Sequence, residues 1–230
     1  DGMAKMLGDK FGIALEYTED RPTTRLAMMP VGETYIELLQ GTSPDSGATK
    51  WLAEKGQSLF HICFEVEDID TLRFFAAQHL GGSYRYLVLV EGNDPRLIDL
   101  AVLSRLPLGA VASHQHAVHR EQPAEAVFSR DLLEVDILHP TNGSRLLTVF
   151  NNHLKSQFVP FDQDPVAGKE ANDTRRRRQA ETVERIVAAR TRPDSRFLVL
   201  GDLNDSPDAP PLAAITASEQ LGLVNGLAQP

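Results

Sequence analysis

Short apolar runs separated by polar turns follow one another along most of the chain, which predicts many strands and few helices. The strands expected in the second half of the chain cover residues 86–90, 98–103, 111–113, 132–138, 146–150 and 197–200. Apolar residues at helical spacing predict helices over 69–80 and 173–190, the second with Ala180, Val183 and Ile186 on one face. This mixture predicts an α+β protein built from packed layers.

The first part of the chain has its own pattern. Strands are expected over 25–30 and 34–39 around a tight turn, followed by a helix over 46–55. A nearly continuous apolar run over 59–66 is typical of a buried strand. Residues 157–169 predict an irregular stretch before the last long helix. No linker rich in Gly, Ser or Pro marks a boundary between domains.

Composition narrows the class of protein. The chain has 230 residues, 42% of them hydrophobic and 24% charged, which is ordinary for a soluble globular protein. A net charge of −9 argues against broad, tight binding to nucleic acid, although a nuclease site that holds Mg²⁺ is itself rich in carboxylates. No apolar run reaches the roughly 20 residues that cross a bilayer, so we expect no membrane span. The single cysteine, Cys63, lies in an apolar run and is expected to be a buried, reduced thiol, as in a cytoplasmic protein.

An acid and an amide follow the apolar strand at 197–200. Asp202 and Asn204 stand two positions apart, so their side chains point the same way if the strand continues. A carboxylate can bind a hard cation or take a proton from water, and an amide can orient that water or a phosphate oxygen. The alternative is an Asx-rich turn with a structural role only.

A second strand, 146–150, runs directly into Asn151, Asn152, His153 and Lys155. A histidine at a strand end can hydrogen-bond a phosphoryl oxygen or pass a proton. The alternative is a loop histidine without a partner.

Basic residues gather at 175–178. Arg177 stands four positions before Glu181, a spacing that favours an ion pair on a solvated helix face. We therefore expect Arg175 and Arg176 to be solvated rather than to form a phosphate-binding cluster. Three histidines stand close together, at His114, His116 and His119. Their spacing suits neither a metal-binding pair on a helix nor a zinc finger, so we expect them in loops.

Several ordered segments together resemble the endonuclease/exonuclease/phosphatase superfamily. They cover 93–99, 103–105, 128–131, 151–156, 177–181 and 198–205, and the likeness extends over about 65–229. The resemblance implies a four-layered α/β sandwich whose strand ends hold one or two Mg²⁺ or Mn²⁺ ions. It also implies a phosphoester substrate, either nucleic acid or a small phosphorylated molecule, attacked in line by water.

The resemblance assigns roles to individual residues. Asp202 and Asn204 match the family's Asp-X-Asn pair, and His153 matches its histidine at the end of the preceding strand. Glu65 fills the place of the family's metal-binding glutamate, which makes Glu65 and Asp202 the expected metal ligands. The polar positions expected to line the phosphate site are Arg96, Asp99 and Arg130.

Some parts of the family pattern are missing. Phe64 stands where the family has Gln, and Leu97 stands where it has Gly. The first strand with its Asn and the closing Ser-Asp-His are absent. Loss of a general acid or base costs roughly 10²- to 10⁴-fold in rate. We therefore expect weak or no activity from the chain as it stands.

The segments 32–39 and 60–69 carry a second resemblance, to methylmalonyl-CoA epimerases of the vicinal-oxygen-chelate (glyoxalase-like) group. The likeness covers about 5–69 and implies a partial βαβββ module around one divalent metal. Glu37 and His61 fall at ligand positions of that site, and the alternative for His61 is a packed strand histidine.

The expected organisation is a partial epimerase-like module over 1–69, joined to an incomplete endonuclease/exonuclease/phosphatase-like domain over 65–230. The two resemblances overlap in one short string, which suggests an artificial joint. Amplification of the region from source DNA as one continuous piece would count against that hypothesis. The expected function is a metal-dependent phosphoester hydrolase, and the alternatives are an epimerase-like isomerase or a chimeric, non-catalytic fragment.

Overall fold

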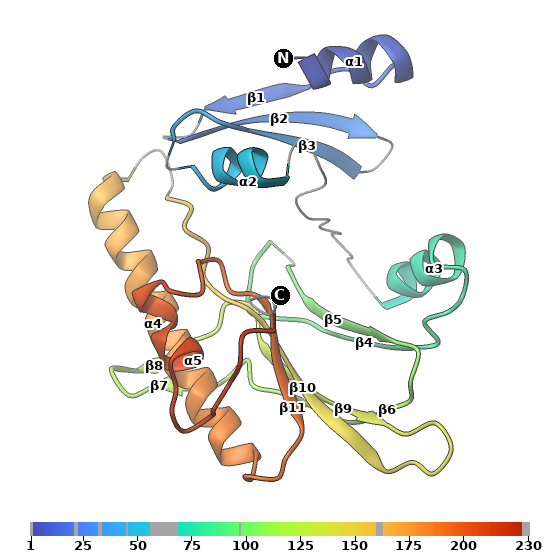
Figure 1. The fold of residues 1–230 in the computed structure, drawn as a ribbon, viewed down its shortest axis with the longest axis vertical. Helices are drawn as coiled ribbons and strands as arrows, with labels where there is room; N and C mark the ends of the chain where they lie inside the picture. The colour runs from blue at the N-terminus through green and yellow to red at the C-terminus, as the bar shows by residue number, and fades with distance from the viewer. Residues whose placement is uncertain are drawn as a thin grey trace. The chain divides into compact units, whose positions relative to one another are not determined.

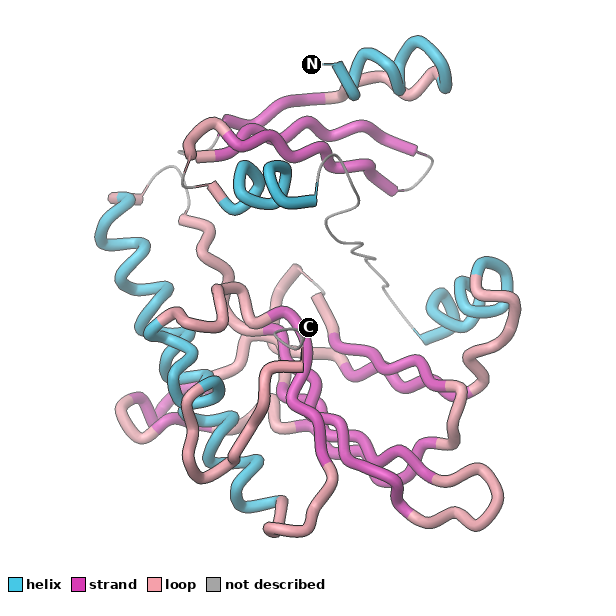
Figure 2. Tube along the Cα trace, in the orientation of Figure 1, coloured by secondary structure: helices cyan, strands magenta, loops and turns pink. Residues whose placement is uncertain are grey.

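The computed structural model describes residues 2–20, 23–31, 34–44, 46–55, 69–96, 98–159 and 163–226. The chain divides into two compact units, Asp1–Phe64 and Glu65–Pro230, and each is described by itself. Figure 1 labels their helices and strands, and Figure 2 separates them from the loops.

The first unit holds an antiparallel sheet of order β1-β2-β3. Its elements are α1 (Gly2–Phe11), β1 (Tyr17–Asp20), β2 (Thr24–Val31), β3 (Thr34–Gly41) and α2 (Gly47–Lys55). Ser46 directly precedes α2, and its Oγ accepts the Ala48 N–H at 3.2 Å, as a capping residue does. The same Oγ lies 3.1 Å from Thr24 Oγ1 on β2. The strands expected over 25–30 and 34–39 and the helix over 46–55 are confirmed. The strand expected over 59–66 lies outside the described residues.

The second unit is built around a four-stranded sheet of order β11-β10-β9-β6. In this sheet β10 and β11 are parallel, and the other neighbouring strands are antiparallel. Two hairpins, β4–β5 and β7–β8, hold the other strands among the described residues of this unit. Its elements are α3 (Ile69–His79), β4 (Tyr86–Val90), β5 (Leu100–Ser104), β6 (Leu108–Ser113), β7 (Val118–His119), β8 (Gln122–Ala126), β9 (Leu132–Leu138), β10 (Arg145–His153), α4 (Pro165–Arg190), β11 (Phe197–Asp202), η1 (Pro210–Leu212) and α5 (Ala213–Thr216).

Alternating side chains of β9 and β10 build a core on each face of this sheet. Leu132 and Phe150 pack with Val183 and Val187 of α4 on one face. Leu133, Val135 and Val149 pack with Leu100 of β5 on the other. Figure 1 shows α4 running along the sheet on one side and β4–β5 on the other. The expected α+β class is confirmed, whereas the incomplete four-layered sandwich stays a prediction.

Helix α4 starts earlier than its apolar pattern indicates. It begins at Pro165 and not at 173, so the irregular stretch expected over 157–169 is wrong for its last five positions. Asp164 Oδ1 accepts the N–H groups of Val166 at 3.1 Å and Ala167 at 2.8 Å, and proline is favoured in the first turn. The capping residue and the proline, and not a repeat of apolar residues, therefore set this helix boundary.

Candidate functional site

The carboxyl ends of β10 and β11 lie side by side. The parallel register pairs His153 with Asp202, and the Leu154 N–H donates to the Asp202 carbonyl at 2.9 Å. His153 Nε2 lies 3.9 Å from Asp202 Oδ2, which is too far for a hydrogen bond but close enough for a shared ligand or water. The structure thus brings together two of the residues that the sequence singled out.

The turn after β11 orients the Asp-X-Asn pair. Gly201 has φ +121°, and a Cβ added there would lie 1.9 Å from the Asn152 carbonyl oxygen, so only glycine fits. Asn204 follows with φ 55°. Its N–H donates to Asp202 Oδ1 at 2.9 Å, and its Nδ2 donates to the Leu154 carbonyl at 3.0 Å. The Asx turn considered as an alternative is therefore present, and Asp202 Oδ2 remains outside it on a side chain that is 62% exposed.

Arg96 and Arg130 meet at one carboxylate, that of Asp94. Arg96 donates to Asp94 through Nε and Nη2, both at 2.9 Å. Arg130 Nε forms an ion pair with Asp94 Oδ2 at 3.1 Å, but within the described residues this buried N–H has no hydrogen-bond acceptor. Hydrogen bonding from Arg96, with the charge on Arg130, lowers the pKa of Asp94 to about 2. Sequence reasoning missed Asp94 as a site residue, although the Asp-Pro-Arg string is a turn signal.

Asp99 holds the loop that carries Asp94 and Arg96. Its Oδ1 accepts the Gly92 N–H at 2.8 Å. Its Oδ2 is buried and, in the part of the chain that the structure describes, accepts no hydrogen bond. A Cβ at Gly92 would lie 2.7 Å from the Arg130 carbonyl oxygen, so this loop packs directly on the Arg130 backbone. Asp99 is therefore best explained as a support for the two arginines.

Charges of both signs act on His153, from Arg130 and Arg96 and from Asp202 and Asp94. Burial lowers the pKa of His153, the nearby charge on Arg130 lowers it further, and Asp202 acts in the opposite direction. Burial also lowers the pKa of Lys155, and the charges on Arg130 and Arg175 add to this effect. Such an arrangement keeps His153 neutral at pH 7 and favours binding of an anion.

The other predicted ligands are placed elsewhere or are not described. Glu65 and His61 lie outside the described residues. Glu37 lies on β3 in the first unit, opposite Met28, with an exposed side chain. Of the predicted site residues, the structure brings His153, Asp202 and Asn204 together where β10 and β11 end.

The basic run at the middle of α4 is not one solvated face. The pair Arg177–Glu181 forms as expected, with Nη1 2.6 Å from Oε1. Arg178 donates to Glu121 and Gln122 on the β7–β8 hairpin, at 3.0 and 2.8 Å. Arg176 is only 1% exposed, so the expectation that it is solvated is wrong.

One group of three possible metal ligands occurs among the described residues, namely His119, Glu121 and Glu181, with ligand atoms within 4.8 Å of one another. His119 Nε2 lies 2.8 Å from Glu181 Oε2, and His119 Nδ1 accepts the Glu121 N–H at 3.2 Å. Arg177 donates to both glutamates, at 2.6 and 2.9 Å. These carboxylates already have donors, so the group is best explained as a contact between the hairpin and α4.

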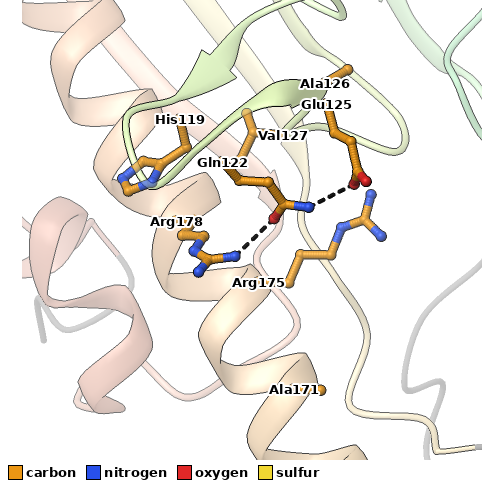
Figure 3. Close-up of a pocket in the computed structure, with 8 residues that line it drawn as sticks. All are labelled: His119, Gln122, Glu125, Ala126, Val127, Ala171, Arg175 and Arg178. Carbon is orange, nitrogen blue, oxygen red and sulfur yellow. Dashed lines mark hydrogen bonds between the residues drawn. The ribbon is translucent and has the colours of Figure 1, made fainter.

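A pocket of about 210 Å³ lies between the same hairpin and helix. Figure 3 shows Gln122 at its centre, accepting a hydrogen bond from Arg178 at 2.8 Å and donating one to Glu125 at 2.6 Å. Arg175, on α4, also lines this pocket. The Gln122 amide therefore links Arg178 to Glu125 within the pocket.

The sequence pattern of the Endonuclease/Exonuclease/phosphatase family matches residues 38–222. The chain belongs to the endonuclease/exonuclease/phosphatase family. The match overlaps the span expected from the motifs and begins upstream of it. Members of this family use divalent metal ions and act on phosphoester substrates.

Among solved structures, the chain is similar to variants of Streptomyces coelicolor methylmalonyl-CoA epimerase in complex with 2-nitronate-propionyl-CoA. One is 26% identical and another 25%, each with a TM-score of 0.28, covering 45% of this chain and 76% and 78% of theirs. A hypothetical protein from Bacillus halodurans is 22% identical, with a TM-score of 0.28, over 45% of this chain and 74% of that one. Because these TM-scores are low, we infer nothing about the function of this chain from these structures. A search of curated proteins finds no match.

Within the described ranges, no helix combines the length and apolar character that a membrane crossing requires.

Proposed function

We propose that the chain is a metal-dependent phosphoester hydrolase whose site lies where β10 and β11 end. The observation that carries this proposal is the register of His153 with Asp202, which sets an imidazole and a carboxylate 3.9 Å apart, near the buried Arg130. Membership of the endonuclease/exonuclease/phosphatase family supports it. We further propose that the site belongs to the domain over 65–230 and that 1–69 forms the separate, epimerase-like module.

The residues present fit a hard divalent cation. Asp202 offers an exposed carboxylate oxygen outside its Asx turn, and Asn204 offers an amide oxygen from the same turn. Oxygen ligands of this kind are those that Mg²⁺ and Mn²⁺ prefer, and Glu65 would complete the set. A bound Mg²⁺ or Mn²⁺ supplies Lewis-acid polarisation of the phosphoryl oxygens.

The protein's own groups perform the remaining tasks. Arg130, Arg96 and Lys155 attract the phosphate and offset its negative charge. His153 is neutral at pH 7, so it can donate a hydrogen bond to a phosphoryl oxygen or accept a proton. Asp202 orients the attacking water, with Asn204 fixed beside it by the Leu154 carbonyl.

The test is hydrolysis of bis(p-nitrophenyl) phosphate by purified protein with Mg²⁺ or Mn²⁺, with and without EDTA. We expect slow hydrolysis that EDTA abolishes and that Asp202→Ala lowers at least about 100-fold. The matched control is Asp194→Ala, at an exposed aspartate in the loop before β11. Hydrolysis that ignores EDTA and survives Asp202→Ala would refute the proposal.

A further inference from the structure

A buried arginine lies behind the strand-end site. Arg176, in the middle of α4, has a side chain that is 1% exposed. A guanidinium is always charged at neutral pH and is costly to bury without partners. The identity of its partners therefore shows what the charge does in this fold.

Arg176 contacts both loops that leave the site. Its Nη1 donates to the Lys155 carbonyl at 2.8 Å, two residues after His153. Its Nε donates to Asp205 Oδ2 at 2.9 Å, three residues after Asp202. Its Nη2 lies 2.9 Å from the same Asp205 oxygen and also bonds Asp173 of its own helix. One planar group thus fixes the β10 loop and the β11 loop together.

A second buried side chain, one turn further along α4, strengthens the β10 contact. Gln179 is 0% exposed, and its Oε1 accepts the Lys155 N–H at 2.7 Å. Its Nε2 donates to the Val127 carbonyl at 3.0 Å, three residues before Arg130. Both backbone groups of Lys155 are therefore held from α4.

Such contacts matter because the sheet ends at this point. The β10–β11 register fixes His153 and Asp202, but it extends no further. Asn204 must hold φ 55°, a conformation that is unfavourable for most non-glycine residues. Its contacts with the β10 loop are two single hydrogen bonds, from its Nδ2 to the Leu154 carbonyl and from Gln157 Nε2 to its own carbonyl, both at 3.0 Å. Precise placement of groups beyond the sheet needs supports of this kind.

We propose that Arg176 is the positioning residue of the strand-end site. It sets the β10 loop, with Lys155, against the β11 loop, with Asn204, and being buried it does not contact substrate. A lysine at 176 keeps the charge but loses the planar fork, so it cannot bond the Lys155 carbonyl and the Asp205 carboxylate with the same geometry. The effect on catalysis rests on the proposed hydrolase function, whereas the coupling of the two loops does not.

The experiment compares wild-type protein with Arg176→Lys and Asp205→Asn. The matched control is Arg185→Lys, at an exposed arginine of the same helix whose Nη2 bonds the Val118 carbonyl at 3.3 Å. Amide hydrogen exchange is followed in residues 154–157 and 203–206, and kcat and KM are measured with bis(p-nitrophenyl) phosphate.

In Arg176→Lys, we expect exchange to rise about tenfold in both loops together, while the strand amides of β10 and β11 keep their protection. We expect kcat to fall roughly 10- to 100-fold, with KM within about threefold of wild type, because misplaced groups affect the transition state most. Asp205→Asn should increase exchange in the same two loops, and Arg185→Lys should change neither quantity.

Exchange that rises in one loop only, or in neither, would overturn the proposal, as would a kcat of Arg176→Lys within twofold of wild type. If Arg176→Lys does not fold, Asp205→Asn gives the exchange readout. Gln157→Ala is then measured beside it, because Gln157 Nε2 also donates to Asp205 Oδ1 at 3.3 Å, and exchange that rises equally in Gln157→Ala would overturn the proposal. If wild-type protein hydrolyses no phosphodiester, the hydrolase function fails, and the exchange result still decides whether Arg176 couples the loops.

Discussion

Replacing Asp94 by asparagine removes the carboxylate on which Arg96 and Arg130 converge. The Asp94 side chain is 4% exposed, and hydrogen bonding from Arg96 lowers its pKa from 3.8 to about 2. A shift of this size corresponds to about 2 kcal/mol of unfolding free energy at pH 7. The substitution also leaves the buried Arg130 without its acidic partner, so we expect a total loss of about 2–4 kcal/mol.

The pH dependence of this loss gives a second check. Because the folded pKa lies below the unfolded value, the carboxylate contributes its full stability above pH 3.8 and loses it as the pH falls toward 2. Urea unfolding of wild-type protein and Asp94→Asn should therefore differ most above about pH 5 and converge at lower pH. Asp70→Asn is the matched control, since Asp70 pairs with Arg73 at 2.8 Å on the surface, where such pairs contribute less than about 1 kcal/mol. Equal losses in the two variants, or a loss that does not shrink on acidification, would refute the reasoning.

Three further predictions concern Gly201, the Asp164 cap of α4 and the titration of His153. Gly201→Ala should cost at least about 2 kcal/mol in thermal or urea unfolding, because of the 1.9 Å approach to the Asn152 carbonyl, and more than Gly143→Ala, where φ is also positive but space is open. Asp164→Ala should lower stability by about 1 kcal/mol and reduce helix content by circular dichroism, because it removes the cap of α4; no change would contradict the early helix start. Burial, then the charge on Arg130, lowers the pKa of His153 below 6.5, so stability should be at its full value above that pH and fall below it. His153→Gln should flatten this dependence between pH 5 and 7.5, and an unchanged slope would be evidence against it.

The sequence predicts the strands well where apolar side chains alternate or cluster. The expected strands over 86–90 and 132–138 coincide with β4 and β9. Apolar side chains of β9 pack on both faces of its sheet, and Val88 and Val90 of β4 pack against one of these cores, so both strands leave a readable pattern. The apolar pattern does not indicate the start of α4, because its first turns carry no repeat of apolar residues at helical spacing and only Asp164 and Pro165 mark it. The β7–β8 hairpin was missed because it is short and polar, and its contacts with α4 come from residues far away in the sequence.

At the site, too, local motifs reveal some residues, whereas others depend on contacts between residues far apart in the sequence. The motifs indicate His153, Asp202 and Asn204, and the structure places them at one sheet edge. The burial of Arg176 was not predictable from local pattern, because its partners Lys155 and Asp205 lie 21 and 29 residues away. The shared carboxylate of Asp94 depends in the same way on Arg130, which a local reading of the 93–99 string does not reveal.

The most direct measurement of the central claim is a titration with Mn²⁺ followed by amide NMR, since a bound paramagnetic ion broadens signals close to it. The account predicts selective broadening at 153–155 and 202–205 at low Mn²⁺, which Mg²⁺ reverses and Asp202→Ala abolishes. Broadening centred instead on His119, Glu121 and Glu181, unchanged in Asp202→Ala, would contradict it.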